Sequence, residues 1–107
     1  METKRILVVD DDELIRKFLL DFFVDLKFEV VTAENGTDAL RKFAPDSFDI
    51  VISDLMMPDM TGIELLKELM IKDKNILFFL ITGYPTLETA VEAIKNGAYD
   101  YIVKPFN

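Results

Sequence analysis

Four residue types are missing from the 107-residue sequence, namely cysteine, histidine, tryptophan and glutamine, and two of these absences limit its chemistry. Without cysteine the chain can form neither a disulfide nor a thiolate metal site, and without histidine it has no imidazole for catalysis or for binding zinc or copper. The longest uninterrupted apolar run, residues 76–81, is far shorter than the roughly 20 residues that cross a bilayer. The first residues lead into a strand-like segment without a signal-peptide cleavage site, so we expect a cytoplasmic protein.

Basic residues are scarce as well. Twelve lysines and arginines stand against twenty aspartates and glutamates, which gives a formal net charge of -8. Nucleic acid and anionic lipid repel a negative domain, so we expect no direct nucleic-acid binding and no membrane binding. Hydrophobic residues make up 50% of the chain, enough for one core, and the length fits a single domain over residues 1–107.

Apolar, β-rich segments alternate with segments of helical period along the chain. The sequence predicts strands at residues 5–10, 28–33, 50–54, 76–82 and 100–103. It predicts helices at about residues 13–27, at 37–43, from 61 onward and at 87–96. Several strands have unbroken apolar cores, which indicates burial on both faces of a parallel sheet. The predicted fold class is therefore α/β, with a doubly wound sheet of five parallel strands.

Local signals mark several helices. The first carries an apolar stripe that should pack on the sheet, made of Ile15, Phe18, Leu19, Phe22, Phe23 and Leu26. Thr61, with Glu64 three positions later, is a capping-box arrangement that predicts the start of the third helix. Gly97 is predicted to end the fourth helix. We assign four aromatic residues entirely to packing, namely Phe22, Phe23, Phe78 and Phe79.

The sequence ends at Asn107, a few residues after the fifth predicted strand. A doubly wound sheet needs helices on both faces, so we expect the usual fifth helix to be missing and part of one face to be bare. An exposed apolar face promotes association. We therefore expect the chain to be a piece of a longer protein, truncated after its fifth strand, with a homo-oligomer that covers the bare face as the alternative.

Polar residues that can carry chemistry follow the predicted strands. They are Asp10, Asp11 and Asp12 where the first strand finishes, Asp54 at the end of the third, Thr82 at the end of the fourth and Lys104 after the fifth. In doubly wound folds, ligands bind at the carboxyl ends of the parallel strands. We therefore expect these carboxylates, the hydroxyl and the ammonium group to meet at one edge of the sheet.

Carboxylates that lie this close repel one another, so they need protons or a cation. Carboxylate and carbonyl oxygens suit Mg²⁺, which often acts beside phosphate groups, and Mn²⁺ is an alternative ion. A carboxylate that attacks a phosphoryl group forms an aspartyl phosphate, while the metal and a cation neutralise charge on the transferring oxygens. Asp54 is our candidate nucleophile, with Lys104 pairing with the phosphoryl oxygens and Thr82 donating a hydrogen bond.

Four groups of residues resemble a known family. They are residues 6–11 (ILVVDD), 54–62 (DLMMPDMTG), 82–83 (TG) and 101–106 (YIVKPF). In order and spacing they are similar to the receiver domain of bacterial response regulators, of the CheY-like superfamily, and the resemblance covers nearly the whole chain. It implies a flavodoxin-like sheet of order 2-1-3-4-5. It also implies a phospho-accepting domain of two-component signalling, which controls an output domain or downstream protein and catalyses only its own phosphorylation and dephosphorylation.

The resemblance assigns roles to the acidic residues. A partner histidine kinase would phosphorylate Asp54. The Mg²⁺ ligands would be Asp11, Asp54, the main-chain carbonyl of Met56 and, through water, Asp10. Asp12 would cap the first helix, although its place in the acidic run leaves a supporting role in the metal site open.

The resemblance also assigns roles at the ends of the last two strands. Lys104 would bind the phosphoryl group and precede a cis peptide bond to Pro105. Thr82 and Tyr101 would be the switch pair that moves inward on phosphorylation. Residues 82–90 further resemble receivers attached to ATPase-driven transcription activators or to kinases.

Each of these residues also has a purely structural explanation. The acidic run could favour the start of a helix, and Asp54 could form a turn. Thr82 could cap the turn that follows it, and Lys104 could be a solvated charge on an edge strand. Tyr101 alone would be assigned to the core. The presence of all of them at matching strand ends favours a shared site.

Three other functions compete with phospho-acceptance. Asp10 and Asp12 form the D-x-D pair of an aspartate-nucleophile phosphohydrolase, but such enzymes carry a larger fold and a substrate-covering cap. A nucleotide-binding module would need a glycine-rich phosphate loop after the first strand, and the sequence has none there. The third is a receiver-like interaction module that works without phosphorylation.

Overall fold

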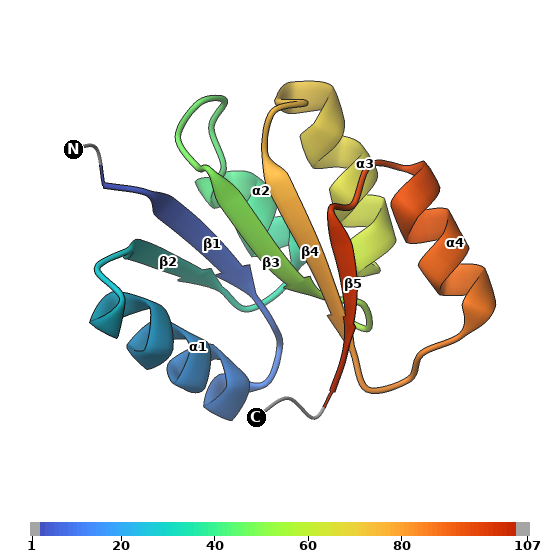
Figure 1. Ribbon diagram of the computed structural model, residues 1–107, viewed down its shortest axis with the longest axis horizontal. Helices are drawn as coiled ribbons and strands as arrows, with labels where there is room; N and C mark the ends of the chain where they lie inside the picture. Colours follow the sequence, from blue (N-terminus) through green and yellow to red (C-terminus); the bar gives the residue numbers. More distant parts are fainter. Residues whose placement is uncertain (1–2, 105–107) are drawn as a thin grey trace.

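The computed structural model describes residues 3–104, which form a five-stranded parallel sheet with four helices (Figure 1). The elements are β1 (Arg5–Val9), α1 (Glu13–Asp25), β2 (Glu29–Ala33), α2 (Gly36–Lys42), β3 (Ile50–Asp54), α3 (Gly62–Lys72), β4 (Leu77–Thr82), α4 (Leu87–Lys95) and β5 (Asp100–Val103). The strand order is β2-β1-β3-β4-β5. The α/β class, the parallel sheet and the order 2-1-3-4-5 are therefore confirmed.

The helices cover the two faces of the sheet unequally (Figure 1). α1 packs on β1 and β2 on one face, whereas α2, α3 and α4 lie on the other. The larger core lies under these three helices, and its fully buried side chains include Val51, Leu66 and Phe78. A smaller core lies on the α1 side and contains Ile6, Val8, Leu19, Ile52 and Ile81. Burial on both faces is the reason for the unbroken apolar runs of the strands.

Helix ends follow the local signals except at one position. Thr61 and Glu64 form a complete capping box at the start of α3, as predicted. Gly97 lies just beyond α4 with a φ of +104°, a left-handed conformation that favours glycine, so its predicted place at the helix end is confirmed. The predicted end of the first helix at residue 27 is wrong. α1 ends at Asp25 because Lys27 has a φ of +72°, which no right-handed helix contains.

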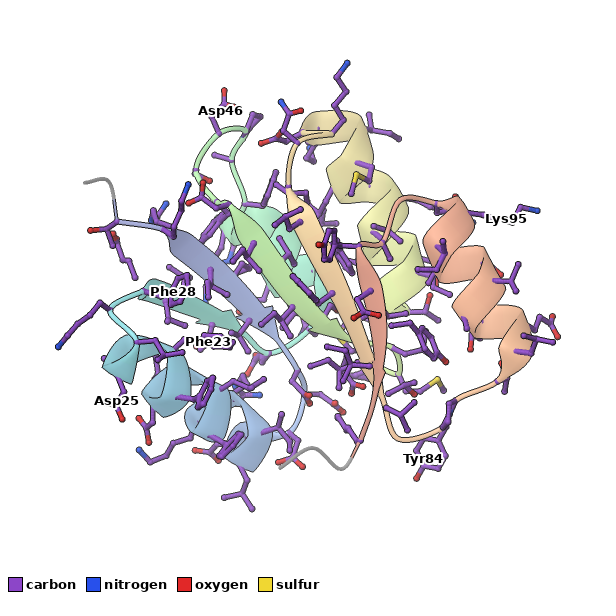
Figure 2. The ribbon with its side chains drawn as sticks, viewed as in Figure 1. Phe23, Asp25, Phe28, Asp46, Tyr84 and Lys95 are labelled. Carbon is purple, nitrogen blue, oxygen red and sulfur yellow. The ribbon has the colours of Figure 1, made fainter. Side chains whose placement is uncertain are left out.

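Within residues 3–104, α1 is the one helix on its face of the sheet and leaves part of that face uncovered, as expected. A hollow of about 370 Å³ lies between α1 and the strands, and apolar side chains line it, among them Phe18, Phe22, Ile50, Ile52, Phe79 and Ile102. Phe23 also lines the hollow, and its ring contacts that of Phe28 between α1 and β2, with centroids 5.7 Å apart (Figure 2). None of the helices within residues 3–104 has the length and apolar composition needed to span a membrane.

The assignment of Phe22 entirely to packing is wrong. Its side chain is 50% exposed, although its ring contacts those of Phe18 and Phe23. The physical reason is that Phe22 lies on the side of α1 that faces the hollow, where no other described element covers it. The periodicity of the helix predicts an apolar stripe but not how much of the stripe the sheet covers.

Candidate functional site

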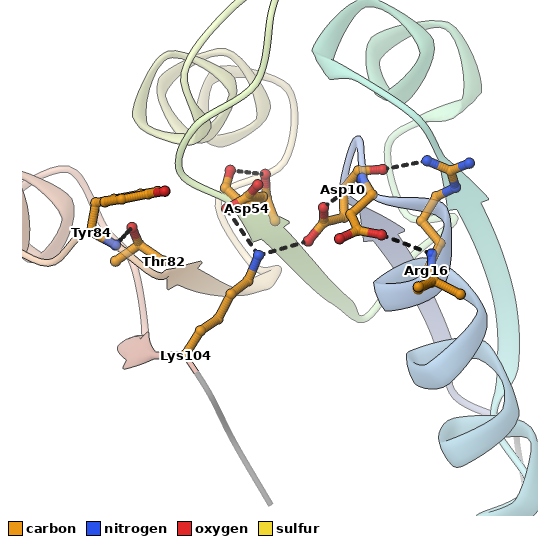
Figure 3. A network of polar contacts seen from close by, with 9 residues as sticks. Asp10, Arg16, Asp54, Thr82, Tyr84 and Lys104 are labelled. Carbon is orange, nitrogen blue, oxygen red and sulfur yellow. Dashed lines mark hydrogen bonds and ion pairs between the residues drawn. The ribbon is translucent and has the colours of Figure 1, made fainter.

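The residues predicted to form the site lie together at the carboxyl edge of the sheet (Figure 3). Asp10 directly follows β1, Asp54 is the last residue of β3, Thr82 is the last residue of β4, and Lys104 directly follows β5. These four strands are parallel and adjacent in the sheet. Their ends therefore bring together side chains that are far apart in the sequence.

Three carboxylates form the centre of the site. Oxygen atoms of Asp10, Asp11 and Asp54 lie within 4.8 Å of one another. Asp10 and Asp54 are buried, with 2% and 8% of their surface exposed, whereas Asp11 is exposed. All three offer hard oxygen donors, and Asp11 opens the group to solvent. The donor set and spacing fit a partly hydrated divalent cation such as Mg²⁺.

Lys104 lies between two of these carboxylates (Figure 3). Its Nζ is 3.2 Å from Oδ2 of Asp10 and 3.5 Å from Oδ1 of Asp54. A single ammonium group thus faces two buried carboxylates, which leaves the centre with an excess of negative charge. The predicted cis peptide bond between Lys104 and Pro105 lies outside the described residues.

Burial and repulsion change the ionisation of these groups. Burial, followed by the charge of Asp10, raises the pKa of the Asp54 carboxyl to about 6, although Lys104 and a hydrogen bond from the Met56 main-chain N–H act in the opposite direction. Burial also raises the pKa of Asp10 in spite of its contact with Lys104. For Lys104, burial lowers the pKa, but the charges of Asp10 and Asp54 outweigh it and raise the pKa. The surroundings therefore disfavour full ionisation of the carboxylates unless a further cation is present.

In metal-free buffer, we expect the free energy of unfolding to fall as the pH rises from about 4 to about 6. Asp54 binds its proton more tightly in the folded state, where its pKa is about 6, than in the unfolded chain, where the value is near 3.8. The folded state gains from this proton at low pH and loses the gain as Asp54 ionises. Asp54→Asn should remove the contribution of Asp54, so its stability relative to the wild type should rise by roughly 1–3 kcal/mol between pH 4 and pH 7.

Urea denaturation of both proteins in EDTA at the two pH values measures this change. If the stability difference between Asp54→Asn and the wild type is the same at both pH values, the raised pKa of Asp54 is contradicted.

The loop between β1 and α1 is held by its own side chains and by α1. The Asp10 carboxylate accepts the main-chain N–H of Asp12 at 2.9 Å, and the Asp12 carboxylate accepts that of Leu14 at 2.9 Å. Asp12 is thus the N-cap of α1, as predicted, and does not belong to the close group of three carboxylates. Sequence reasoning missed Arg16, whose Nη1 donates to the main-chain oxygen of Asp10 at 2.8 Å (Figure 3). Its spacing of one helical turn from the N-cap was the available signal.

Thr82 and Tyr101 have different surroundings. Thr82 is fully buried, and its Oγ1 accepts the main-chain N–H of Tyr84 at 2.9 Å (Figure 3). Tyr101 is half-buried, and its ring packs against the larger core. Its hydroxyl lies 2.7 Å from Oγ1 of Thr89 in α4. Sequence reasoning missed Thr89, and the available signal was its position three residues after Thr86, the N-cap of α4.

Asp59, another residue that sequence reasoning missed, joins the loop after β3 to the start of α2. Its carboxylate accepts the main-chain N–H groups of Gly36 and Thr37 at 3.1 and 2.7 Å and the Thr37 hydroxyl at 2.6 Å. The bond from the Thr37 hydroxyl contributes most to lowering the pKa of Asp59 to about 2. Asp59 thereby anchors the loop that contains Met56. The main-chain N–H of Met56 donates to the Asp54 carboxyl. The main-chain carbonyl of Met56 stays a predicted metal ligand.

Comparisons with known proteins point to one family. The sequence model of the response regulator receiver domain matches residues 6–107. The chain is 44% identical over 103 residues to the regulatory protein AtoC of Escherichia coli K12, a match that covers 96% of this chain and 22% of AtoC. It is 40% identical over 104 residues to the chemotaxis protein CheY of Thermotoga maritima, covering 96% of this chain and 87% of CheY. The chain thus spans about a fifth of the first relative and most of the second.

A solved structure shows the same similarity. The response regulator protein TrrA of Thermotoga maritima, solved in complex with Mg²⁺-BeF, is 38% identical and superposes with a TM-score of 0.86. The superposition covers 98% of this chain and 90% of TrrA. The similarity in sequence and the similarity in structure therefore both extend over nearly the whole chain.

Proposed function

The chain belongs to the response regulator receiver domain family, and we propose that its Asp54 accepts a phosphoryl group in a Mg²⁺-dependent reaction. Members of this family are signalling domains rather than classical enzymes, so the reaction would be confined to the domain's own phosphorylation and dephosphorylation. The observation that carries the proposal is the position of the Asp54 carboxylate, 3.5 Å from the Lys104 ammonium and within 4.8 Å of two further carboxylates.

Asp54 is placed to act as the nucleophile. One of its carboxylate oxygens would attack phosphorus and form a new O–P bond, while the bond between phosphorus and the donor breaks and its electron pair leaves with the donor. Lys104 would neutralise charge on the phosphoryl oxygens. The Thr82 hydroxyl already accepts the Tyr84 N–H through a lone pair, so its hydrogen would be available to a phosphoryl oxygen.

The metal would be Mg²⁺ held by Asp11, Asp54, the main-chain carbonyl of Met56 and, through water, Asp10, and Mn²⁺ would suit the same donors. When bound, the ion would neutralise the carboxylates and the phosphoryl oxygens together. The complex of TrrA with Mg²⁺-BeF supports this assignment, because BeF attached to a carboxylate oxygen has the tetrahedral shape of a phosphoryl group. The three clustered carboxylates of this chain support it independently.

The partners follow from the same proposal. A histidine kinase would donate the phosphoryl group, and Thr82 and Tyr101 would be the switch pair that transmits its presence to an output domain or downstream protein. This would take place in the cytoplasm, without direct binding of nucleic acid or membrane by this domain. A homo-oligomer would use the bare face, where the apolar hollow is open.

The competing phosphohydrolase would require Asp10 and Asp12 together in the site. Asp12 instead caps α1 and is held by the Leu14 N–H. Asp10 instead contacts Lys104. The structure thus supports the nucleophile on β3 rather than a D-x-D pair on the loop after β1.

Incubation with acetyl phosphate and Mg²⁺ is expected to add one phosphoryl group to the protein, because this small donor needs no kinase. Intact-mass spectrometry detects the adduct. Asp54→Asn keeps the shape of the side chain but removes the nucleophile, so the adduct should disappear. Asp49→Asn is the matched control, since Asp49 directly precedes β3 at the opposite edge of the sheet, and its adduct should persist.

Three other results of this experiment would contradict the proposal. An adduct that persists in Asp54→Asn would contradict the assignment of the acceptor. No adduct on any variant would favour the interaction module that works without phosphorylation. Sustained hydrolysis of phosphate esters would favour the phosphohydrolase.

A further inference from the structure

Hydroxyl groups at the start of α4 form a connected network with Tyr101 of β5. The Tyr101 hydroxyl lies 2.7 Å from Thr89 Oγ1 and accepts the Thr86 main-chain N–H at 3.4 Å. Thr89 Oγ1 also lies 2.8 Å from Thr86 Oγ1 and 3.2 Å from the Thr86 main-chain oxygen. Tyr101 is therefore attached to the first turn of α4 through two threonines.

This turn is also the N-terminal cap of α4. Thr86 Oγ1 accepts the main-chain N–H of Thr89 at 3.0 Å. The first N–H groups of a helix have no partner within the helix, and the Tyr101 oxygen serves one of them, that of Thr86. One assignment of hydrogens satisfies the whole network: Thr86 N–H donates to Tyr101, Tyr101 O–H and Thr86 O–H both donate to Thr89 Oγ1, and Thr89 O–H donates to the Thr86 carbonyl.

Tyr101 is a close neighbour of the end of β4, where Thr82 lies. Tyr101 pairs with Leu80 across the two strands, and both side chains contribute to the larger core. Thr82 follows Leu80 by two residues, so its side chain lies on the same face of the sheet. Residues 83–86 connect Thr82 to the threonine network. A movement of Thr82 would therefore change both the space beside Tyr101 and the segment that leads to its hydrogen-bond partners.

We propose that Thr89 is a positioning residue that holds Tyr101 in its unphosphorylated position and so opposes the phosphoryl-dependent switch. The inference rests on the proposed function of Asp54, Thr82 and Tyr101. Any displacement of the Tyr101 ring breaks the contact with Thr89 and withdraws the acceptor from the Thr86 N–H. Because these bonds exist in the starting position and are lost in the displaced one, they shift the equilibrium toward the starting position.

Removal of the Thr89 hydroxyl should therefore favour the phosphoryl-bound state. Thr89→Val keeps the branched shape of the side chain but cannot form the bond. Its affinity for BeF₃⁻ in saturating Mg²⁺, measured by NMR titration, is expected to rise about three- to tenfold, the change that one hydrogen bond supplies. Thr89→Ser restores the hydroxyl and should bind BeF₃⁻ as the wild type does.

A second set of variants shows whether the effect passes through Tyr101. In a Tyr101→Phe background the partner hydroxyl is absent, so Thr89→Val should change the BeF₃⁻ affinity no further. Urea denaturation of the same four proteins without metal gives the coupling between the two hydroxyls independently of any phosphoryl analogue, and it should be favourable.

Two results would overturn the inference while leaving the proposed function intact. In one, BeF₃⁻ binds the wild type and Thr89→Val equally well; in the other, the effect of Thr89→Val persists in Tyr101→Phe. If BeF₃⁻ binds none of the variants, the proposed function fails and the inference fails with it. The metal-free denaturation then still reports whether the two hydroxyls interact.

Discussion

Replacing Asp11 with alanine is expected to abolish phosphorylation while leaving the metal-free protein at least as stable as the wild type. Asp11 is exposed, and its carboxylate lies within 4.8 Å of those of Asp10 and Asp54. Like charges at this distance repel, so the loss of one should relieve the folded state. The same change removes a proposed ligand of Mg²⁺, so the rate of reaction with acetyl phosphate should fall by roughly 100-fold or more.

Thermal and urea unfolding with and without Mg²⁺ separate the two effects. Mg²⁺ at ten times its dissociation constant should raise the free energy of unfolding of the wild type by about 1.4 kcal/mol, and Asp11→Ala should lose this rise. Glu13→Ala is the matched control, because Glu13 is an exposed carboxylate in the first turn of α1 outside the group of three. It should keep the Mg²⁺ response.

The metal-free stability of Asp11→Ala and its response to Mg²⁺ test separate claims. A clear loss of metal-free stability in Asp11→Ala would refute the argument from repulsion. A Mg²⁺ response equal to that of the wild type would refute the role of Asp11 as a ligand.

The second large effect is expected from Gly62→Ala, at the start of α3. A methyl group at Gly62 would overlap the main-chain oxygen of Asp54 and lie 2.6 Å from Cδ1 of Leu80. The Asp54 peptide is fixed at the end of a buried strand, and Gly62 N–H is itself bonded to the oxygen of Leu55 at 2.8 Å. Relief of the overlap must therefore move main-chain atoms, which should cost about 2–3 kcal/mol of stability. Because Asp54 would move with its peptide, phosphorylation should also slow.

Gly36→Ala is the matched control for this prediction. The nearest atoms to a methyl group at Gly36 all belong to the Met60 side chain, with Sδ at 2.5 Å. A methionine side chain can adopt another rotamer, so the loss of stability should be less than about 1 kcal/mol. Urea denaturation compares the two variants. Equal losses at both positions would contradict the argument that the fixed Asp54 peptide makes Gly62 necessary.

The fold was predictable because its signals are local. Unbroken apolar runs identify the buried parallel strands, and the capping box at Thr61 identifies the start of α3. The two errors concern features without such a signal. Lys27 adopts a positive φ that glycine or asparagine would have indicated, and the exposure of Phe22 depends on how much of the sheet α1 covers.

The site was predictable to the extent that strand ends carry it. Asp10, Asp54, Thr82 and Lys104 were found because each directly follows or ends a strand. Asp59 and Thr89 were missed because their roles lie in contacts with residues on or beside other elements, and Arg16 was missed because its partner is a main-chain oxygen of the preceding loop. Asp59, for example, binds residues 22 and 23 positions away, and no periodicity of the sequence connects those positions.

The sequence by itself determined the α/β class and the residues at the carboxyl edge of the sheet, and its motifs determined the family resemblance and with it the strand order. The tertiary structure decided which carboxylates form one group, that Asp12 is a helix cap outside it, and that the pKa of Asp54 is raised. It also decided the attachment of Tyr101 to Thr89. The reason is physical: secondary structure and burial follow from periodic patterns of neighbouring residues, whereas distances, desolvation and charge interactions between side chains of separate elements depend on how the whole chain packs.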